Sequence, residues 1–163
     1  MAILVVMSIP NLHPDITFEK LGPSQSECDF AFEAKRAAMG PHILKAWEWD
    51  EKFQRDVHNR NYEAKPFYAI RIEDARVGTL SFQPLEDYIR FGEFYLRPSV
   101  QGRGTGTKIL THCLTMAESM RLPTRLEYLH WNPVASLYAR HGFKEIGRSD
   151  THIFMERPTS RPR

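Results

Sequence analysis

The sequence has few cysteines, and their positions argue against both a metal site and a disulfide framework. Only two of the 163 residues are cysteine, Cys28 and Cys113. They lack the spacing of metal ligands, and one pair makes no disulfide scaffold. Both fall in segments predicted to be helical, so we expect free, buried thiols. A reducing, cytoplasmic setting is the corresponding expectation.

Long apolar runs and charge of one sign are also missing. The apolar segment 1–9 is too short to span a bilayer and has no basic region before it, so neither a membrane span nor a secretion signal is expected. There are 22 basic and 20 acidic side chains, and the formal charge is +2. No Lys/Arg stripe of the kind that binds nucleic acid stands out. We therefore expect neither nucleic-acid nor membrane partners.

What is present is the composition of an ordinary globular protein. Hydrophobic residues make up 42% and charged residues 26% of the chain, and 163 residues fit one domain. We predict an N-terminal extension at 1–15, one domain at 16–157 and a flexible tail at 158–163. The tail is basic and rich in proline and serine.

The hydrophobic periodicity predicts a mixed α/β fold. Alternating or apolar runs predict strands at 16–21, 67–72, 77–82, 88–97, 125–131, 143–146 and 151–156. Helical spacing predicts helices at 24–39, 41–59, after the turn that ends at 107, and from Asn132 to 141, where Asn132 is the expected N-cap. The order is β-α-α-β-β-β-α-β-α-β-β, around a mixed central sheet. Residues 88–131 form a right-handed parallel βαβ crossover in this interpretation.

A glycine-rich turn between a strand and a helix carries the chemical signal. Its sequence, Gln101-Gly-Arg-Gly-Thr-Gly-Thr107, lets backbone amides approach a ligand at a helix N-terminus, where phosphate oxygens bind well. A P-loop needs a glycine before its Lys-Ser/Thr pair, and here Thr107 precedes Lys108. The dinucleotide fingerprint G-x-G-x-x-G also fails, because Thr107 takes the place of its third glycine.

Two ordered motifs resemble the GNAT superfamily of N-acetyltransferases. Gln101, Gly104 and Gly106 fill the pattern Q-x-x-G-x-G, similar to that family's acyl-coenzyme A pyrophosphate loop. The segment 132–143, NPVASLYARHGF, resembles its N-x-x-A-x-x-L-Y-x-x-x-G-F segment. The resemblance covers about the C-terminal half, and the element order extends it. It implies a GNAT-like acyl-CoA N-acyltransferase fold, with acetyl-CoA as co-substrate and no metal.

The resemblance also implies the cofactor-binding residues. The pantetheine arm is expected along the strand that holds Tyr95, Leu96 and Arg97. The pyrophosphate is expected on the turn that consists of Gln101, Gly102, Arg103, Gly104, Thr105, Gly106 and Thr107. Asn132 and Tyr138 complete the set.

Catalytic roles follow from the chemistry of thioester aminolysis. The departing thiolate needs a proton, and Tyr138, which matches the family's tyrosine, is the candidate general acid. The competing interpretation is a packed aromatic residue. Glu93 is the candidate general base, with Glu127 and His130 as competitors and a solvated strand residue as the alternative.

The resemblance also implies that the acceptor side is formed by the two N-terminal helices, which in that family cover the mouth of the cleft. Trp47, Trp49 and Arg36 are the candidate substrate residues, because aromatic and acidic groups suit a cationic amine. Two tryptophans at i and i+2 do not share one helix face, so at least one is expected to face a cleft or a partner; packing of both between helices and sheet is the alternative.

The sequence thus predicts an N-acetyltransferase that acts on a primary amine of a small molecule by direct attack in a ternary complex. A protein or peptide amine acetyltransferase and a non-catalytic acyl-CoA-binding regulatory module stay open as alternatives. The acceptor, the acyl-chain preference and the oligomeric state, a homodimer being one option, are left open.

Overall fold

The computed structural model describes residues 8–41, 44, 49–130, 132 and 134–162. Its strands are β1 (Ile16–Lys20), β2 (Phe67–Ile72), β3 (Ala75–Pro84), β4 (Ile89–Leu96), β5 (Thr124–Leu129), β6 (Lys144–Arg148) and β7 (His152–Arg157). Its helices are α1 (Gln25–Met39), α3 (Glu51–Ala64), the short 3-10 turn η1 (Pro98–Val100), α4 (Thr105–Ser119) and α5 (Ala135–Arg140). None of the described helices is long and apolar enough to cross a membrane.

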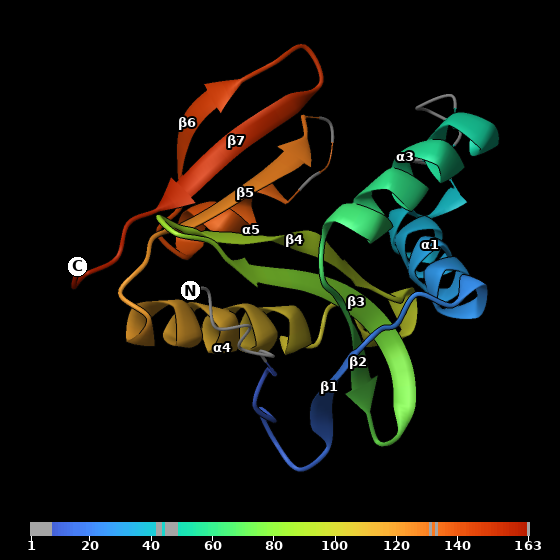
Figure 1. The fold of residues 1–163 in the computed structure, drawn as a ribbon, viewed down its shortest axis with the longest axis horizontal. Coiled ribbons are helices and arrows are strands. Elements are labelled where there is room, and N and C mark those ends of the chain that lie inside the picture. Colours follow the sequence, from blue (N-terminus) through green and yellow to red (C-terminus); the bar gives the residue numbers. More distant parts are fainter. Residues whose placement is uncertain (1–7, 42–43, 45–48, 131, 133, 163) are drawn as a thin grey trace, which may run out of the picture.

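The seven strands form one mixed sheet in the order β1-β2-β3-β4-β5-β7-β6. Every neighbouring pair is antiparallel except β4 and β5, which are parallel and are connected by α4 (Figure 1). The predicted α/β fold class, the order of elements and the parallel crossover are confirmed.

The sheet is covered on both faces, which explains why β2 is buried along most of its length. Tyr68 and Ile70 belong to the main core with Ile109 and Leu110 of α4. Phe67 and Ala69, one residue out of phase, pack with α1 in a second cluster. Because successive strand side chains point to opposite faces, α1 and α4 lie on opposite sides of the sheet.

The helix predicted at 41–59 is wrong in its extent. Asp50 has an extended backbone, and its carboxylate accepts a hydrogen bond from the Phe53 amide at 3.0 Å. An aspartate that caps a helix in this way starts a new one, so α3 begins at Glu51 and continues to Ala64. Residues 42–43 and 45–48, including Trp47, lie outside the described residues.

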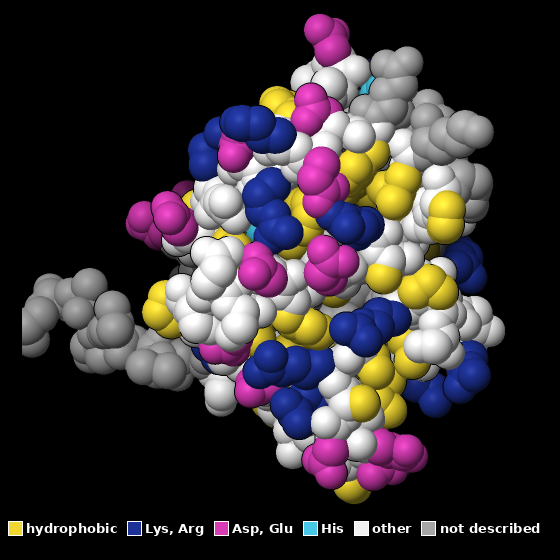
Figure 2. Space-filling view, turned by 90° about the vertical axis from the view of Figure 1, so that its right-hand side faces the viewer, with side chains coloured by type: hydrophobic (Ala, Val, Ile, Leu, Met, Phe, Trp, Pro, Cys, Tyr) yellow, Lys and Arg dark blue, Asp and Glu magenta, His cyan; other side chains and the backbone are white. Residues whose placement is uncertain are grey.

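The outer surface of α1 and α3 carries basic and acidic side chains side by side (Figure 2). Ion pairs join the two helices there, among them Arg55 with Asp29 at 2.6 Å and Arg36 with Glu51. The described residues of this face therefore carry both signs of charge side by side and form no positive stripe.

The start of the last helix also differs from the prediction. Asn132 is not the N-cap, because its carbonyl accepts the Val134 amide at 2.9 Å in a tight turn, and α5 begins only at Ala135. Pro133 lies outside the described residues. Both cysteines are free and buried, as expected.

Described residues near both ends of the chain contact the domain. Ile9, from the segment expected to be an extension, is buried in the main core, and the Pro10 carbonyl is hydrogen-bonded to His112 at 2.7 Å. In the segment expected to be a flexible tail, the hydroxyls of Thr159 and Ser160 donate to the Glu118 carboxylate. These bonds attach residues 159 and 160 to α4.

Candidate active site

The sheet opens between its two parallel strands. β4 and β5 pair only at Ile89 with Thr124 and at Arg90 with Arg125, and then diverge. A bulge in β4 increases the divergence: Glu93 has a φ of 47°, and the register against β3 shifts between Thr79 and Ser81. The Thr79 hydroxyl donates to the Glu93 carbonyl at 2.8 Å and holds the bulge in place.

A cavity of about 880 Å³ occupies this opening. Its walls come from α1, α3, β4, β5, α5 and the β6–β7 hairpin, so segments distant in the sequence meet there. Phe53 of α3 and Ile146 of β6 also line it, and they are the large hydrophobic residues most exposed to solvent in the described part of the chain. The divergence of two strands therefore creates a site of small-molecule size.

Tyr138 reaches the cavity from α5. Its side chain is 6% exposed and packs on Tyr128 and Phe143, with ring centroids 6.0 and 5.6 Å away. Burial raises the pKa of its hydroxyl far above the ordinary value, so the group stays protonated. Within the described residues the hydroxyl has no hydrogen-bond partner. Tyr95 of β4 is half-buried and brings a second phenol to the lining, and desolvation of its hydroxyl raises the pKa of this group as well.

Glu93 places a carboxylate in the same cavity, and it is paired. The Lys65 ammonium lies 3.1 Å from Glu93 Oε1, and the two side chains are 14% and 11% exposed. Lys35 of α1 lines the cavity as well and is 7% exposed. Lys65 was missed by sequence reasoning, since a single lysine before a strand carries no pattern. Its role as partner arises only from the bulge that turns Glu93 toward it.

Of the competing bases, Glu127 of β5 lines the cavity, whereas His130 is absent from the lining described here. The side chain of Glu127 is exposed to solvent. Asn132 lines the cavity although it caps no helix. The fold thus brings Tyr138, Glu93, Tyr95 and Asn132 to one cavity.

The glycine turn lies after η1, at the N-terminus of α4. Gly102 and Gly104 have φ values of 76° and 77°, a left-handed conformation that favours glycine. A Cβ at either position would meet nothing within 4 Å, so the space above these peptides is open. Alternating left-handed residues before a helix turn backbone amides toward one point, which suits an anion.

Gln101 fastens this turn to β4. Its side-chain amide donates to the Leu96 carbonyl at 2.7 Å, and its position is therefore fixed by the end of the strand. The glutamine of the Q-x-x-G-x-G pattern is thus hydrogen-bonded to the backbone of the protein itself.

Fewer peptide groups of β4 are available to the pantetheine arm than the sequence predicted. The Arg97 amide donates to the Val77 carbonyl at 2.9 Å and is thus used within the sheet. Because peptide groups alternate between the two edges of an antiparallel strand, Tyr95 also faces β3 and Leu96 faces the open edge. Of the three residues named from the sequence, only Leu96 turns its peptide toward that edge.

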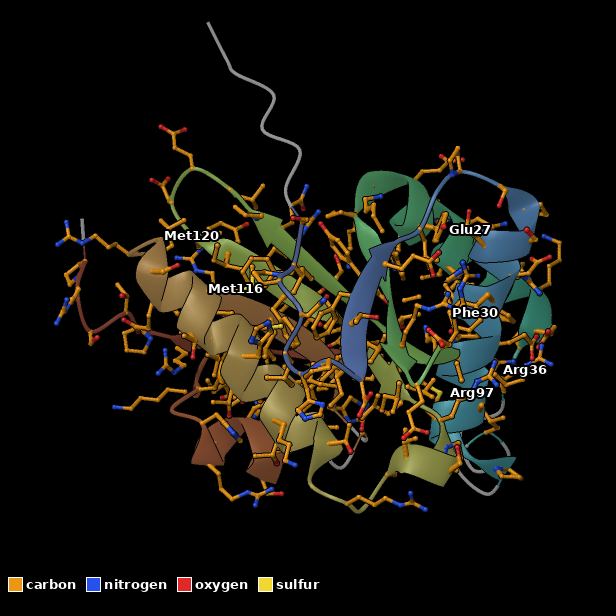
Figure 3. The ribbon with its side chains drawn as sticks, turned by 90° about the horizontal axis from the view of Figure 1, so that it is seen from below. Glu27, Phe30, Arg36, Arg97, Met116 and Met120 are labelled. Carbon is orange, nitrogen blue, oxygen red and sulfur yellow. The ribbon has the colours of Figure 1, made fainter. Side chains whose placement is uncertain are left out.

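Two of the predicted acceptor residues, Trp49 and Arg36, do not line the cavity. Trp49 packs on Phe32 of α1 with ring centroids 6.0 Å apart, and its indole N–H donates to Glu51 at 2.7 Å. Trp49 is not among the described residues that line the cavity. Arg36 lies at the outer side of α1, where it pairs with Glu51, while Arg97 lies beside Phe30 (Figure 3). Trp47 falls outside the described residues, and the cavity lining contains neither Trp49 nor Arg36 in the part of the chain described.

Residues 63–145, just over half of the chain, match the family described as acetyltransferase (GNAT) domain. The chain belongs to the GNAT acetyltransferase family. As a GNAT protein it is an acetyl-CoA-dependent N-acetyltransferase. No curated protein sequence matches the chain significantly.

Solved GNAT structures share the fold at low sequence identity. The PaiA N-acetyltransferase of Thermoplasma acidophilum, determined in complex with coenzyme A, has a TM-score of 0.66 and 16% identity over 87% of this chain and 99% of that one. The ribosomal-protein-S18-alanine N-acetyltransferase of Escherichia coli has a TM-score of 0.62 and 19% identity over 89% and 94%. A putative acyl-CoA N-acyltransferase of Klebsiella pneumoniae has a TM-score of 0.59 and 22% identity over 88% and 97%.

The residues present fit an acyl-CoA. The open space above Gly102 and Gly104 suits a pyrophosphate, and the free edge of β4 suits an amide-containing arm. In the described part of the chain, no group of three or more His, Cys, Asp or Glu residues is arranged to hold a metal ion.

Proposed function

We propose that this GNAT protein transfers the acetyl group of acetyl-CoA to a primary amine of a small molecule, by direct attack in a ternary complex. The single observation that carries the proposal is the cavity between β4 and β5, which is lined by both Tyr138 and Glu93. Its volume of about 880 Å³ lies within the range of small-molecule sites.

The acetyl-CoA is held from the side of α4 in this proposal. The pyrophosphate rests on the amides of the turn from Gln101 to Thr107, and the helix N-terminus favours its charge. The pantetheine arm pairs with the open edge of β4 at Leu96. The thioester then lies where β4 and β5 diverge, in reach of the cavity.

In this proposal every proton that moves during the transfer has a donor and an acceptor. An acceptor ammonium gives one proton to the Glu93 carboxylate, directly or through water, and becomes a nucleophilic amine. Its nitrogen attacks the thioester carbonyl, and a C–N bond forms as the C–S bond breaks. The Tyr138 hydroxyl protonates the departing sulfur, and the proton that the nitrogen loses restores the hydroxyl. The products are the acetylated amine and coenzyme A, and Glu93 releases its proton to solvent.

A direct attack is favoured over an acetyl-cysteine intermediate. Cys113 is buried between α4 and the sheet, and burial raises its thiol pKa to about 12, which disfavours the nucleophilic thiolate. Cys28 is buried in α1 and its thiol pKa is raised as well, mainly by burial. Neither cysteine lines the cavity in the described part of the chain.

The test is acetyl-CoA-dependent thiol release by purified protein with polyamines, amino acids, aminoglycosides and short peptides, with product masses measured by mass spectrometry. We expect one class of small amines to gain about 42 Da, the mass added when an acetyl group replaces a hydrogen on nitrogen. Acetylation of peptides alone would replace the small-molecule acceptor by a protein amine. Coenzyme A binding without acetylation of small amines, peptides or proteins would favour a binding module.

A further inference from the structure

Lys35 is a buried lysine that lines the cavity. It lies on α1, and its residue is only 7% exposed. Within the described residues, its ammonium makes no hydrogen bond or ion pair. Burial of an unpaired charge is unfavourable, and burial indeed lowers the pKa of Lys35, while the nearby Glu93 carboxylate opposes this effect. Such a group is retained at a stability cost.

The nearest carboxylate is already paired. Glu93 forms its ion pair with Lys65 at 3.1 Å, so these three side chains comprise two cations and one anion. The positive charge of Lys65 further lowers the pKa of Lys35. These three side chains therefore carry one positive charge in excess.

Three other charged groups of the lining bind elsewhere in the protein, and Glu127 on the β5 wall has an exposed carboxylate. The Arg125 guanidinium pairs with Glu156 at 2.7 Å, and the Asp50 carboxylate caps α3. The Arg90 guanidinium donates to the Gln83 side chain. Among Lys35, Lys65 and Glu93, Lys35 is the charge that has no partner within the described residues.

We propose that the acceptor amine carries an anionic group, a carboxylate or a phosphate, and that this group pairs with Lys35. The inference rests on the proposed function and narrows its substrate class to small molecules with an amine and an anion. The ammonium end meets Glu93 and the anionic end meets Lys35. An anion at Lys35 neutralises the excess charge and compensates the burial of the lysine.

Matched ligand pairs test this proposal by binding. Calorimetry on protein saturated with coenzyme A compares amino acids with their amides, and phosphoethanolamine with ethanolamine, so that carboxylate and phosphate are distinguished. We expect the anionic member of at least one pair to bind about 10- to 100-fold more tightly, as for a buried charge-assisted hydrogen bond. Kinetics with the same pairs should show the preference in KM.

Three variants identify the residue responsible. Lys35→Met should remove the preference, with the neutral member bound as before, and Lys35→Arg should retain part of it. Lys52→Met is the matched control, because Lys52 lies on α3 with an 88% exposed side chain and should leave the preference unchanged. Lys35→Met should unfold at the same or a higher temperature than the wild type, because it removes a buried charge.

The outcomes separate this inference from the proposed function. Acetylation of neutral and anionic amines with equal affinity would overturn the role of Lys35 and leave the proposed function intact. Lys35-dependent binding of anionic amines without acetylation would support Lys35 and overturn the proposed function. A Lys35→Met variant with lower kcat for neutral amines would indicate that Lys35 is a proton acceptor and would contradict an anion site. Failure of every anionic ligand to bind would also contradict the anion site.

Discussion

The Lys65 ammonium lies 3.1 Å from the Glu93 carboxylate, and this pair joins the end of α3 to the bulge of β4. The bulge turns Glu93 toward the cavity, and Thr79 holds its carbonyl. One local irregularity in a strand thus opens the sheet and positions the candidate base. The opposite wall supplies the candidate acid, Tyr138, so the two groups approach a ligand from different elements.

Replacement of Tyr138 by phenylalanine should lower kcat about 100-fold, the lower end of what general acid catalysis contributes. Affinity for coenzyme A should stay the same, because the ring and its packing on Phe143 are preserved. Steady-state kinetics and calorimetry measure the two quantities. Tyr95→Phe is the matched control, since it removes the other phenol that lines the cavity. A larger loss in Tyr95→Phe would transfer the acid role to Tyr95.

Glu93→Gln should lower kcat/KM about 100-fold at neutral pH, because the amide does not accept the acceptor's proton. The loss should shrink as pH rises, since more of the acceptor amine is then already neutral. The pH profile of kcat/KM measures this. Glu127→Gln is the control, as Glu127 also lines the cavity from β5. A greater effect of Glu127→Gln would identify it as the base, and a loss that is uniform across pH would indicate that Glu93 only maintains the bulge with Lys65.

Gly106→Ala should separate stability from cofactor binding. A Cβ there would lie 3.6 Å from Leu96 Cδ1 and 3.9 Å from Phe94 Cζ, which is ordinary contact, and alanine favours a helix over glycine by up to about 1 kcal/mol. The melting temperature should hold or rise. The dissociation constant of coenzyme A should increase, because the methyl group narrows the space between α4 and the open edge of β4. Tight binding in a stable variant would exclude the cofactor from this gap.

Trp49→Ala should reduce stability and leave the acceptor's KM unchanged. Trp49 is half-buried against Phe32, so truncation should cost about 1–2 kcal/mol, less than for a fully buried aromatic residue. Chemical denaturation and acceptor kinetics measure the two effects. A raised KM at unchanged stability would return Trp49 to the acceptor site.

The fold could be predicted from the sequence because the patterns that indicate its elements are local. Glycine at positions 102 and 104 meets a requirement of the backbone, and periodic apolar residues such as Ile109 and Leu110 define α4. These features depend on a few neighbouring residues, so the element order could be predicted.

The acceptor side depends on contacts between distant segments, which sequence patterns do not reveal. Trp49 and Arg36 suggested a pocket by residue type, but Trp49 packs against Phe32 of α1, next to the cap that Asp50 makes on α3. The pairing of Lys65 with Glu93 and the burial of Lys35 require the bulge of β4, which no sequence pattern indicated. The helix start at Asn132 was wrong for a local reason, because the Asn132 carbonyl accepts the Val134 amide in a turn before α5.

The central claim is that the cavity between β4 and β5 is where acetyl transfer occurs. The most direct test is mass spectrometry of amine products formed from acetyl-CoA by wild type and Tyr138→Phe in parallel. The account predicts an acetylated small amine with the wild type and strong loss of that product with the variant, at equal coenzyme A affinity. Equal product from both proteins would contradict it.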